Sequence, residues 1–464
     1  MERVNPATGE ALDPIEADDE AAVEAALATA DEAFESWRDV PLAEREELLA
    51  SAADVLRENE AEYAELMTAE MGKPLAAARS EVQKCAWVCD YYAEHAGEHL
   101  QDERVGAEPG VDSFVAYEPL GPILAVMPWN FPFWQVFRFA APHLTSGNVG
   151  LLKHASNVPG CAEAIEEVFR EAGYPEGVFQ TLLVGSDAVD GIVEDDRLKA
   201  VTLTGSEYAG RAVAETAGAE LKKTVLELGG SDPFVVLDDA DVAAAAATGA
   251  RARTINSGQS CIAAKRFIVH EDVSDEFVEA FVAEMEALDV GDPHEDVDLG
   301  PQARADLMED LHEQVERSVE AGATVELGGE PLDRDGFFYP PTVLTDVPRD
   351  AAVAEEEVFG PVAPIFEVAD ETEAIALAND TDLGLGGSVW TEDRERGTRL
   401  AREIESGAVF VNELTKSDPR LPFGGIGDSG YGRELGKMGI HEFVNRKTVW
   451  VQDAEMPEDE PAGE

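Results

Sequence analysis

The chain has 464 residues, of which 44% are hydrophobic, so it can bury more than one core and is too apolar to be largely disordered. Its 97 acidic and 34 basic residues give a formal net charge of −63, which repels the phosphates of nucleic acids and anionic membranes. We therefore expect neither as a partner. No apolar stretch reaches the roughly 18 residues of a membrane span. The chain start lacks the pattern of a secretory signal, so we expect a cytoplasmic protein.

The first hundred residues have the apolar spacing of helices, and the rest alternates between strands and helices. Helices are predicted over 18–37, 41–71 and about 75–100. Strands are then predicted at 113–118, 123–127, 149–152, 179–184 and 200–203, with helices at 161–172, near 188 and at 207–217. A second alternating block runs from 234 to 410, and a strand at 447–452 precedes an acidic tail that we expect to be disordered. This alternation predicts an α/β protein with parallel sheets in two large domains.

Cys261 ends the segment Gly258-Gln259-Ser260-Cys261 and lies 34 residues after Glu227. A thiol in a loop of small residues is open to close approach by a substrate, and a distant carboxylate could be the base of a covalent mechanism. A single cysteine is more often structural, so this interpretation depends on the other motifs. Cys85, Cys89 and Cys161 are expected to pack as small apolar residues, and no metal site is predicted because no nearby ligands complete a set.

Two polar residues follow predicted strands, where function is common. Glu227 ends an apolar strand before Gly229-Gly230, at the sheet edge where parallel sheets hold functional groups, although an ion-paired loop residue would look the same. Asn130 lies between Pro128 and Pro132, which fix the local backbone. Its side-chain amide could donate to a developing oxyanion, although a proline-rich turn with a capping Asn would look the same.

Three further segments could hold a cofactor. Thr204-Gly205-Ser206 follows a strand and opens a helix, so its free N–H groups and the Ser206 hydroxyl would suit a pyrophosphate, although the spacing is not Gly-x-Gly-x-x-Gly. Lys153 ends a strand and could meet a ribose or a phosphate. Glu357 could accept hydrogen bonds from ribose hydroxyls. Taken alone, each charge is equally an ordinary surface residue.

Seven motifs in this order resemble those of the NAD(P)-dependent aldehyde dehydrogenase superfamily and cover nearly the whole chain. They are Pro-Trp-Asn-Phe-Pro at 128–132, Lys153, Thr-Gly-Ser at 204–206, Glu-Leu-Gly-Gly at 227–230, Gly-Gln-Ser-Cys at 258–261, Glu-Val-Phe-Gly-Pro at 357–361 and Pro-Phe-Gly-Gly at 422–425. The resemblance implies a doubly wound cofactor domain (1–104 and 121–228), a related α/β catalytic domain (229–428), a small β oligomerisation element (105–120 and 440–453) and an acidic tail (454–464). It also implies homodimers or homotetramers.

The resemblance implies roles for individual residues. Cys261 would attack the aldehyde carbon, Asn130 and the backbone N–H of Cys261 would hold the oxyanion, and Glu227 would activate water to hydrolyse the thioester. Lys153 and Glu357 would bind the ribose groups of the cofactor. Trp129 and Ser206, with the N–H groups around Gly205, would lie near the phosphates, and Phe359 near the nicotinamide.

One position departs from NAD-preferring relatives. These often carry a glutamate three residues after the ribose-binding lysine, where it pairs with ribose hydroxyls and would repel a 2′-phosphate. This chain has Ser156 there. The cofactor is therefore expected to be NAD or NADP, with dual use or NADP preference.

The segments Glu70–Pro74, Cys89–His95 and Ala263–Arg266 resemble the short succinate-semialdehyde dehydrogenases of prokaryotes. Their substrate carries a carboxylate, which needs a cation or hydroxyls. Arg138, eight residues after Asn130, matches an arginine that serves this role in the broader group, or it pairs with an acidic neighbour instead. A second arginine of that group is replaced by Ile255, and Arg420 and Ser417 are the candidates to compensate.

Other functions remain open on the sequence. A different small aliphatic or aromatic aldehyde would use the same core residues. CoA-acylating and acyl-phosphate-reducing enzymes share the fold, but a hydrolytic base such as Glu227 would waste their thioester. A noncatalytic descendant would not need Cys261, Glu227 and Asn130 together.

The acidic residues are spread along the chain, a composition typical of proteins adapted to concentrated salt. At about 1 M salt the Debye length falls to about 3 Å, which screens the repulsion between carboxylates. We therefore expect activity to fall when salt is removed, as measured by dialysis into dilute buffer followed by assay. Full activity and thermal stability in dilute buffer would contradict salt adaptation.

Overall fold

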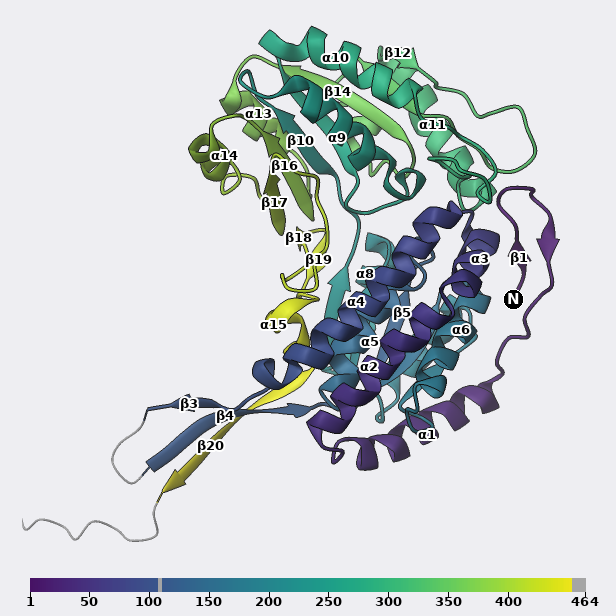
Figure 1. Ribbon diagram of the computed structural model, residues 1–464, viewed down its shortest axis with the longest axis vertical. Helices are drawn as coiled ribbons and strands as arrows, with labels where there is room; N and C mark the ends of the chain where they lie inside the picture. The colour runs from purple at the N-terminus through teal and green to yellow at the C-terminus, as the bar shows by residue number, and fades with distance from the viewer. Residues whose placement is uncertain (107–110, 453–464) are drawn as a thin grey trace, which may run out of the picture.

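Two α/β lobes and a projecting β-arm make up the computed structural model, which describes residues 1–106 and 111–452 (Figure 1). The lower lobe contains the N-terminal helices and a six-stranded sheet, and the upper lobe contains a seven-stranded sheet. The predicted α/β class with parallel sheets is confirmed. Within the described residues, no helix is long and apolar enough to cross a bilayer.

The lower lobe begins with four helices: α1 (Glu20–Trp37), α2 (Leu42–Glu58), α3 (Glu60–Met71) and α4 (Leu75–His99). Asp19 caps α1 by accepting a hydrogen bond from the backbone N–H of Ala22. The stretch 41–71, predicted to be helical, is divided at Asn59. Its backbone leaves the helical region (φ −104°, ψ 15°) and its side-chain amide donates to the carbonyl of Val55, so α2 ends there.

The six-stranded sheet has the order β19-β9-β8-β5-β6-β7 and is parallel except for β19. Its strands are β5 (Pro122–Met127), β6 (Val149–His154), β7 (Phe179–Thr181), β8 (Ala200–Thr204), β9 (Lys223–Glu227) and β19 (Gly430–Tyr431). The intervening helices are α5 (Trp134–Thr145), α6 (Pro159–Glu171), η1 (Ser186–Ala188), α7 (Val189–Glu194) and α8 (Glu207–Ala219). From β5 the chain builds β6 and β7 on one side and then β8 and β9 on the other. Such a switch in direction opens a crevice at the carboxyl ends of β5 and β8.

The upper lobe has a second, mostly parallel sheet of order β12-β13-β14-β11-β10-β16-β17, in which only β12 runs antiparallel to its neighbour. Its strands are β10 (Asp232–Val236), β11 (Ala264–His270), β12 (Thr324–Leu327), β13 (Thr342–Thr345), β14 (Val362–Val368), β16 (Gly386–Trp390) and β17 (Ala408–Val411). Its helices are α9 (Val242–Thr254), η2 (Ile255–Gly258), α10 (Glu271–Glu286), α11 (Ala305–Ala321), α12 (Ala352–Glu355), α13 (Glu371–Ala378) and α14 (Arg394–Leu400). Every residue of β11 is buried, so the loop before it is anchored in the core of this lobe.

The arm is a three-stranded sheet of β3 (Glu103–Val105), β4 (Val111–Pro119) and β20 (Val444–Gln452) (Figure 1). The strands predicted at 113–118 and 123–127 follow each other in the chain, but the corresponding β4 and β5 belong to different sheets. Val105, Trp450 and Val451 are exposed on the arm. Its role in oligomerisation stays a prediction, and the acidic tail lies outside the described residues.

The remaining elements are short: β1 (Arg3–Val4), β2 (Ala11–Leu12), β15 (Leu383–Gly384), β18 (Ile426–Gly427) and α15 (Gly436–Ile440). β19 returns from the C-terminal region to pair with β9, so that Gly430 lies opposite Glu227. This pairing fixes the end of β9 against the last part of the chain.

Candidate active site

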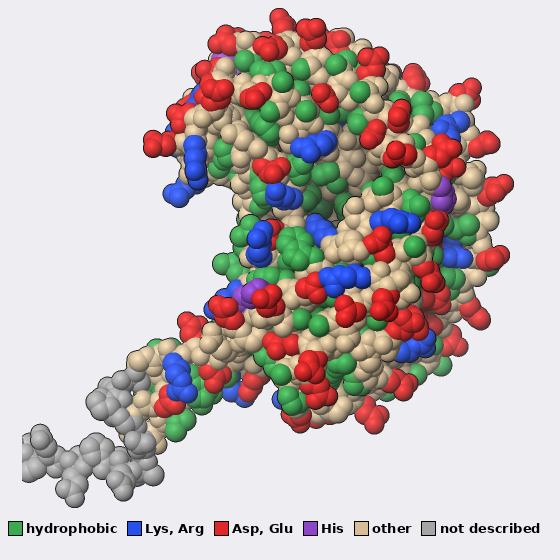
Figure 2. Space-filling view, viewed as in Figure 1, with side chains coloured by type: hydrophobic (Ala, Val, Ile, Leu, Met, Phe, Trp, Pro, Cys, Tyr) green, Lys and Arg blue, Asp and Glu red, His purple; other side chains and the backbone are tan. Residues whose placement is uncertain are grey.

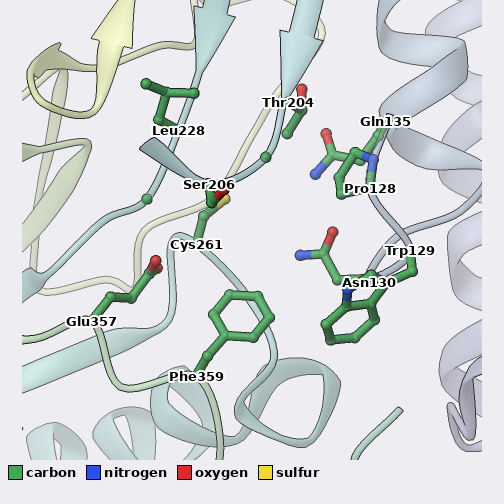
Figure 3. Close-up of a pocket in the computed structure, with 12 residues that line it drawn as sticks. Pro128, Trp129, Asn130, Gln135, Thr204, Ser206, Leu228, Cys261, Glu357 and Phe359 are labelled. Atoms are coloured by element: carbon green, nitrogen blue, oxygen red, sulfur yellow. The ribbon is translucent and has the colours of Figure 1, made fainter. Parts of the chain in front are cut away.

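A cavity of about 190 Å³ lies at the carboxyl ends of β5 and β8, at the switch point of the six-stranded sheet (Figure 3). It brings together residues from segments that are far apart in the sequence. Seven of the residues proposed from sequence line it: Trp129, Asn130, Gly205, Ser206, Cys261, Glu357 and Phe359. Among the described residues, no cluster of His, Cys, Asp and Glu is arranged to hold a metal ion.

The loop that carries Cys261 has an unusual backbone. Asn256 (φ 55°) and Ser257 (φ 56°) are left-handed within η2, which costs roughly 1–2 kcal/mol for each non-glycine residue. Gly258 continues the turn at φ 79°. A Cβ at Gly258 would lie 2.2 Å from the carbonyl carbon of Gly360, so this close approach requires glycine.

Arg253 stabilises this turn by hydrogen bonds to backbone carbonyls. Its buried guanidinium donates to the carbonyl oxygens of Ala264 at 2.9 Å, Gly258 at 2.8 Å and Val358 at 3.3 Å. Hydrogen bonds from a charged donor contribute about 1.5–3 kcal/mol each, enough to offset the strain of the left-handed residues. One arginine therefore ties together the three segments that meet around Cys261.

The Glu-Leu-Gly-Gly segment lies against the same loop. A Cβ at Gly230 would be 2.5 Å from the carbonyl oxygen of Cys261, and one at Gly229 would be 2.6 Å from Glu357 Oε2. Lys265 is buried in β11, where its ammonium donates to the Cys261 carbonyl at 2.6 Å and lies 3.3 Å from Glu357 Oε1. The positions of Cys261 and Glu357 are therefore fixed relative to each other.

The surroundings of Cys261 control its protonation. Burial raises the pKa of the Cys261 thiol to about 12, and the positive charges of Lys265 and Arg138 oppose this rise. The thiol is therefore mostly protonated at neutral pH. Since the thiolate is the nucleophile, a neighbouring base or cation is needed to form it.

Asn130 is fixed to the Cys261 loop from the other side. The side-chain Nδ2 of Asn130 donates to the backbone carbonyl of Gln259 at 3.1 Å. The backbone carbonyl of Asn130 accepts from Asn256 Nδ2 at 2.7 Å. Figure 3 shows the side-chain amide turned toward Cys261. An amide nitrogen has two N–H bonds, so one remains for an oxygen atom bound near Cys261.

Glu227 is the one proposed catalytic residue that does not line this cavity. Glu227 is buried at the end of β9. Its Oε1 packs against Gly424, where an added Cβ would lie only 2.5 Å from it. Burial and the neighbouring Glu434 raise the pKa of Glu227 well above its usual value, while Arg138 opposes the rise.

The donor groups around this cavity fit a dinucleotide cofactor. Ser206 is the N-cap of α8, and its hydroxyl accepts from the Ala209 N–H at 3.3 Å. The rings of Trp129 and Phe359 meet edge to face with centroids 5.8 Å apart. Glu357 adds a carboxylate that can accept from hydroxyls.

Lys153 and Ser156 lie beyond the cavity, at the carboxyl end of β6 and in the turn after it. The Lys153 side chain is buried, and in the described part of the chain no carboxylate lies within ion-pair distance of it. Burial lowers the pKa of Lys153, so an anionic ligand would restore the stability of its charge. Ser156 is exposed beside it and adds no negative charge.

A second cavity, of about 470 Å³, meets the first at Cys261 and Gln135, which line both. Basic side chains outnumber acidic ones on its walls, whereas acidic residues dominate the chain as a whole. The charged lining residues are Lys73, Lys84, Arg138, Arg251 and Lys416, with Glu81 and Asp298. In Figure 2, blue side chains gather around the hollow between the lobes, while red ones cover the outer surface. This second cavity therefore suits an anion.

The three substrate-binding candidates have different positions. Arg138 lines the second cavity, forms an ion pair with buried Glu434 and lies 4.6 Å from the ring centroid of Phe423. Ser417 also lines this cavity. Arg420 does not: its side chain is exposed and donates to Asp418 at 2.8 and 2.6 Å. The structure therefore brings Arg138 and Ser417 to Cys261 and leaves Arg420 outside.

Sequence reasoning missed Lys84, Gln135 and Arg251. Ile255 lines the second cavity where the second arginine is absent, and Arg251 lines it one helical turn earlier on α9. The Oε1 atom of Gln135 is buried and has no hydrogen-bond partner in the described structure. Lys84 lies on the helix α4, and its position in the sequence, beside Cys85, gives no signal that it faces a cavity.

Comparisons with known proteins agree with this geometry. The chain matches the model of the aldehyde dehydrogenase family over residues 1–449. It is 56% identical over 449 residues to the probable succinate-semialdehyde dehydrogenase (NADP+) of Synechocystis sp., an alignment that covers 97% of this chain and 99% of that protein. Succinate-semialdehyde dehydrogenase (NADP+) 1 of Mycobacterium tuberculosis is 52% identical over 454 residues, with coverage of 97% and 99%.

Solved structures show the same fold. Succinic semialdehyde dehydrogenase of Streptococcus pyogenes, in complex with NADP+, superposes with a TM-score of 0.95 at 38% identity and covers 97% of this chain and 100% of that one. PnpE in complex with nicotinamide adenine dinucleotide has a TM-score of 0.95 at 33% identity, with coverage of 98% and 95%. The chain therefore belongs to the aldehyde dehydrogenase family and is an NAD(P)-dependent aldehyde dehydrogenase.

Proposed function

We propose that this protein oxidises succinate semialdehyde to succinate, with NADP as the preferred hydride acceptor and NAD as an alternative. The observation that carries the proposal is the excess of basic side chains in the cavity beside Cys261, in a chain with a net charge of −63. A cavity of this charge attracts an aldehyde that bears a carboxylate. The names of the relatives from Synechocystis sp. and Mycobacterium tuberculosis support the same substrate.

In the proposed reaction, Cys261 adds to the aldehyde carbon as a thiolate and forms a hemithioacetal. The positive charges of Lys265 and Arg138 favour the thiolate. The aldehyde oxygen becomes an oxyanion, which accepts from the free N–H of Asn130 and from the backbone N–H of Cys261. One such donor typically contributes about 3–4 kcal/mol to the transition state.

Bound NAD(P) would supply the acceptor for the hydride that leaves the hemithioacetal, and Cys261 would keep the acyl group as a thioester. Glu227 then takes a proton from a water molecule that attacks the thioester. Its raised pKa makes its carboxylate a stronger base than an exposed glutamate, which favours proton abstraction from water. Cleavage of the C–S bond releases the carboxylic acid and returns the thiolate.

The cofactor residues follow from the same arrangement. Ser206 and the N–H groups near Gly205 would bind the phosphates beside Trp129, and Glu357 would accept from a ribose. Lys153 and Ser156 would lie at the adenosine ribose, where a 2′-phosphate would find the cation of Lys153, and where Ser156 itself adds no negative charge. Residues 1–104 and 121–228 would form the cofactor domain and 229–428 the catalytic domain.

Assembly and location complete the proposal. Exposed Trp450 and Val451 on the arm would be covered in a homodimer or homotetramer, with residues 105–120 and 440–453 as the oligomerisation element.

All four cysteines are free thiols, which fits a location in the reducing cytoplasm.

A second candidate is an aromatic or longer aliphatic aldehyde. Phe131, Trp134 and Phe423 line the cavity with the basic residues and offer apolar surface to such a substrate. Glu227 argues against transfer of the acyl group to CoA or phosphate, because it would hydrolyse the thioester first.

The substrate is tested with a panel of aldehydes in concentrated salt. We expect kcat/KM for succinate semialdehyde to exceed that for butanal and benzaldehyde by at least about tenfold, the effect of one charged hydrogen bond. Reduced cofactor should form without CoA, and the product should be the free acid. A preference for benzaldehyde would favour the second candidate, and a requirement for CoA would overturn the hydrolytic mechanism.

Ser156 is tested by substitution. Ser156→Glu is expected to raise the ratio of kcat/KM for NAD to that for NADP by about tenfold or more, because a carboxylate repels the 2′-phosphate. Ser156→Gln has the same size without the charge and should change the ratio much less. An unchanged ratio in Ser156→Glu would show that Ser156 does not face the ribose.

Lys265 is tested through the reactivity of Cys261. Lys265→Met removes a cation that favours the thiolate, so the pKa of Cys261 should rise by about one unit or more. The rate of alkylation by iodoacetamide at pH 9 should then fall about tenfold, as measured by mass spectrometry of the Cys261 peptide. Lys447→Met, on the distant arm, is the control, and equal rates for the two variants would contradict the role of Lys265.

A further inference from the structure

We propose that Lys84 is the residue that binds the distal carboxylate of the substrate, with Ser417 beside it. This inference rests on the proposed function, because it requires an aldehyde that carries a carboxylate. Lys84 lies on α4 (Leu75–His99), and its side chain lines the 470 Å³ cavity that contains Cys261. Lys84 lies outside the seven sequence motifs, and the oxidation of an aldehyde does not by itself require it.

Three of the other four cations that line the cavity form ion pairs. Lys73 forms an ion pair with Glu81, Arg138 with Glu434, and Lys416 with Glu413 at 2.9 Å. The carboxylate in each pair weakens the attraction of its cation for a ligand. Arg251 is exposed at the rim, where water solvates its guanidinium.

Lys84 differs because its side chain is half-buried and has no acidic partner within ion-pair distance in the described residues. The ammonium is 4.3 Å from the ring centroid of Trp134, which covers one side of it. An unpaired, partly buried cation in an acidic protein is stabilised by an anion that enters the cavity.

Ser417 completes a carboxylate site with Lys84. Lys84 Nζ donates to Ser417 Oγ at 2.7 Å, which uses one of its three N–H bonds. The serine hydroxyl accepts this bond and can donate its own proton to a carboxylate oxygen. An ammonium and a hydroxyl side by side can therefore bind both oxygens of one carboxylate.

The charge state of Lys84 gives a direct test. Burial lowers the pKa of Lys84 to about 8, and Arg138 on α5 lowers it further, while Cys85 and Glu81 on α4 and Asp418 in the C-terminal segment oppose this. The ammonium is therefore present below about pH 8 and is lost as pH rises above it. Binding of a carboxylate weakens with the charge, whereas binding of an uncharged aldehyde does not depend on it.

The experiment measures selectivity, defined as kcat/KM for succinate semialdehyde divided by kcat/KM for butanal, with NADP in concentrated salt. Lys84→Met should lower this ratio by roughly 10- to 100-fold, the range expected for a hydrogen bond between charged groups. Lys84→Arg keeps the charge and should retain most of the ratio. Lys416→Met removes an equal charge from the same cavity, but one already paired with Glu413, and should lower the ratio much less than Lys84→Met does.

The same ratio is then followed from pH 6.5 to pH 10. In the wild-type enzyme it should fall as pH rises through about 8, and taking the ratio cancels the titration of Cys261 and Glu227. Lys84→Arg should give a flat profile, because a guanidinium stays charged over this range.

A flat wild-type profile, or an unchanged ratio in Lys84→Met, would overturn the assignment of Lys84 while leaving the proposed function intact. A wild-type enzyme that does not prefer succinate semialdehyde to butanal would overturn both. An equal loss in Lys416→Met would show that general cavity charge, and not Lys84, selects the substrate.

Discussion

The close approach of three backbone segments around Cys261 is the constraint on which the site depends. Gly258 touches the Gly360-Pro361 backbone, Gly230 touches the carbonyl of Cys261, and a side chain at either position would overlap main-chain atoms. Arg253 and Lys265 satisfy the carbonyl oxygens that this crowding buries. These contacts hold the Cys261 loop in place. Asn130 from the lower lobe and Glu357 from the upper lobe therefore line one cavity with the Cys261 thiol.

Much of this arrangement could be predicted from sequence, since glycine, proline and a short polar segment constrain the backbone locally. The strand–helix alternation gave the α/β class, and the cavity contains Cys261, Asn130 and Ser206 as expected. Contacts between distant segments left no local pattern. Glu434 lies almost 300 residues after Arg138, its ion-pair partner, and Lys84 meets Ser417 across a similar gap. The separation of β4 from β5 also depended on pairing with β20, at the far end of the chain.

Electrostatics divides the molecule into two regions. The outer surface is covered by carboxylates, many of them paired with arginines at the surface, where each pair contributes little to stability (Figure 2). Around the active-site hollow the sign of the charge is reversed. Burial there removes water from the charged groups and raises the pKa of Cys261 and Glu227. The same exclusion of water strengthens the electrostatic interactions of these two side chains with a bound group.

The junction of two cavities at a single thiol has a consequence for turnover. With the cofactor in the first cavity and the aldehyde in the second, as proposed, the two would reach Cys261 from different sides, and neither would have to leave for the other to enter. Oxidation of a semialdehyde, however, produces a second carboxylate within the positively charged cavity. A wall that attracts the proposed monoanionic substrate would then hold a dianionic product more strongly and slow the departure of the acid.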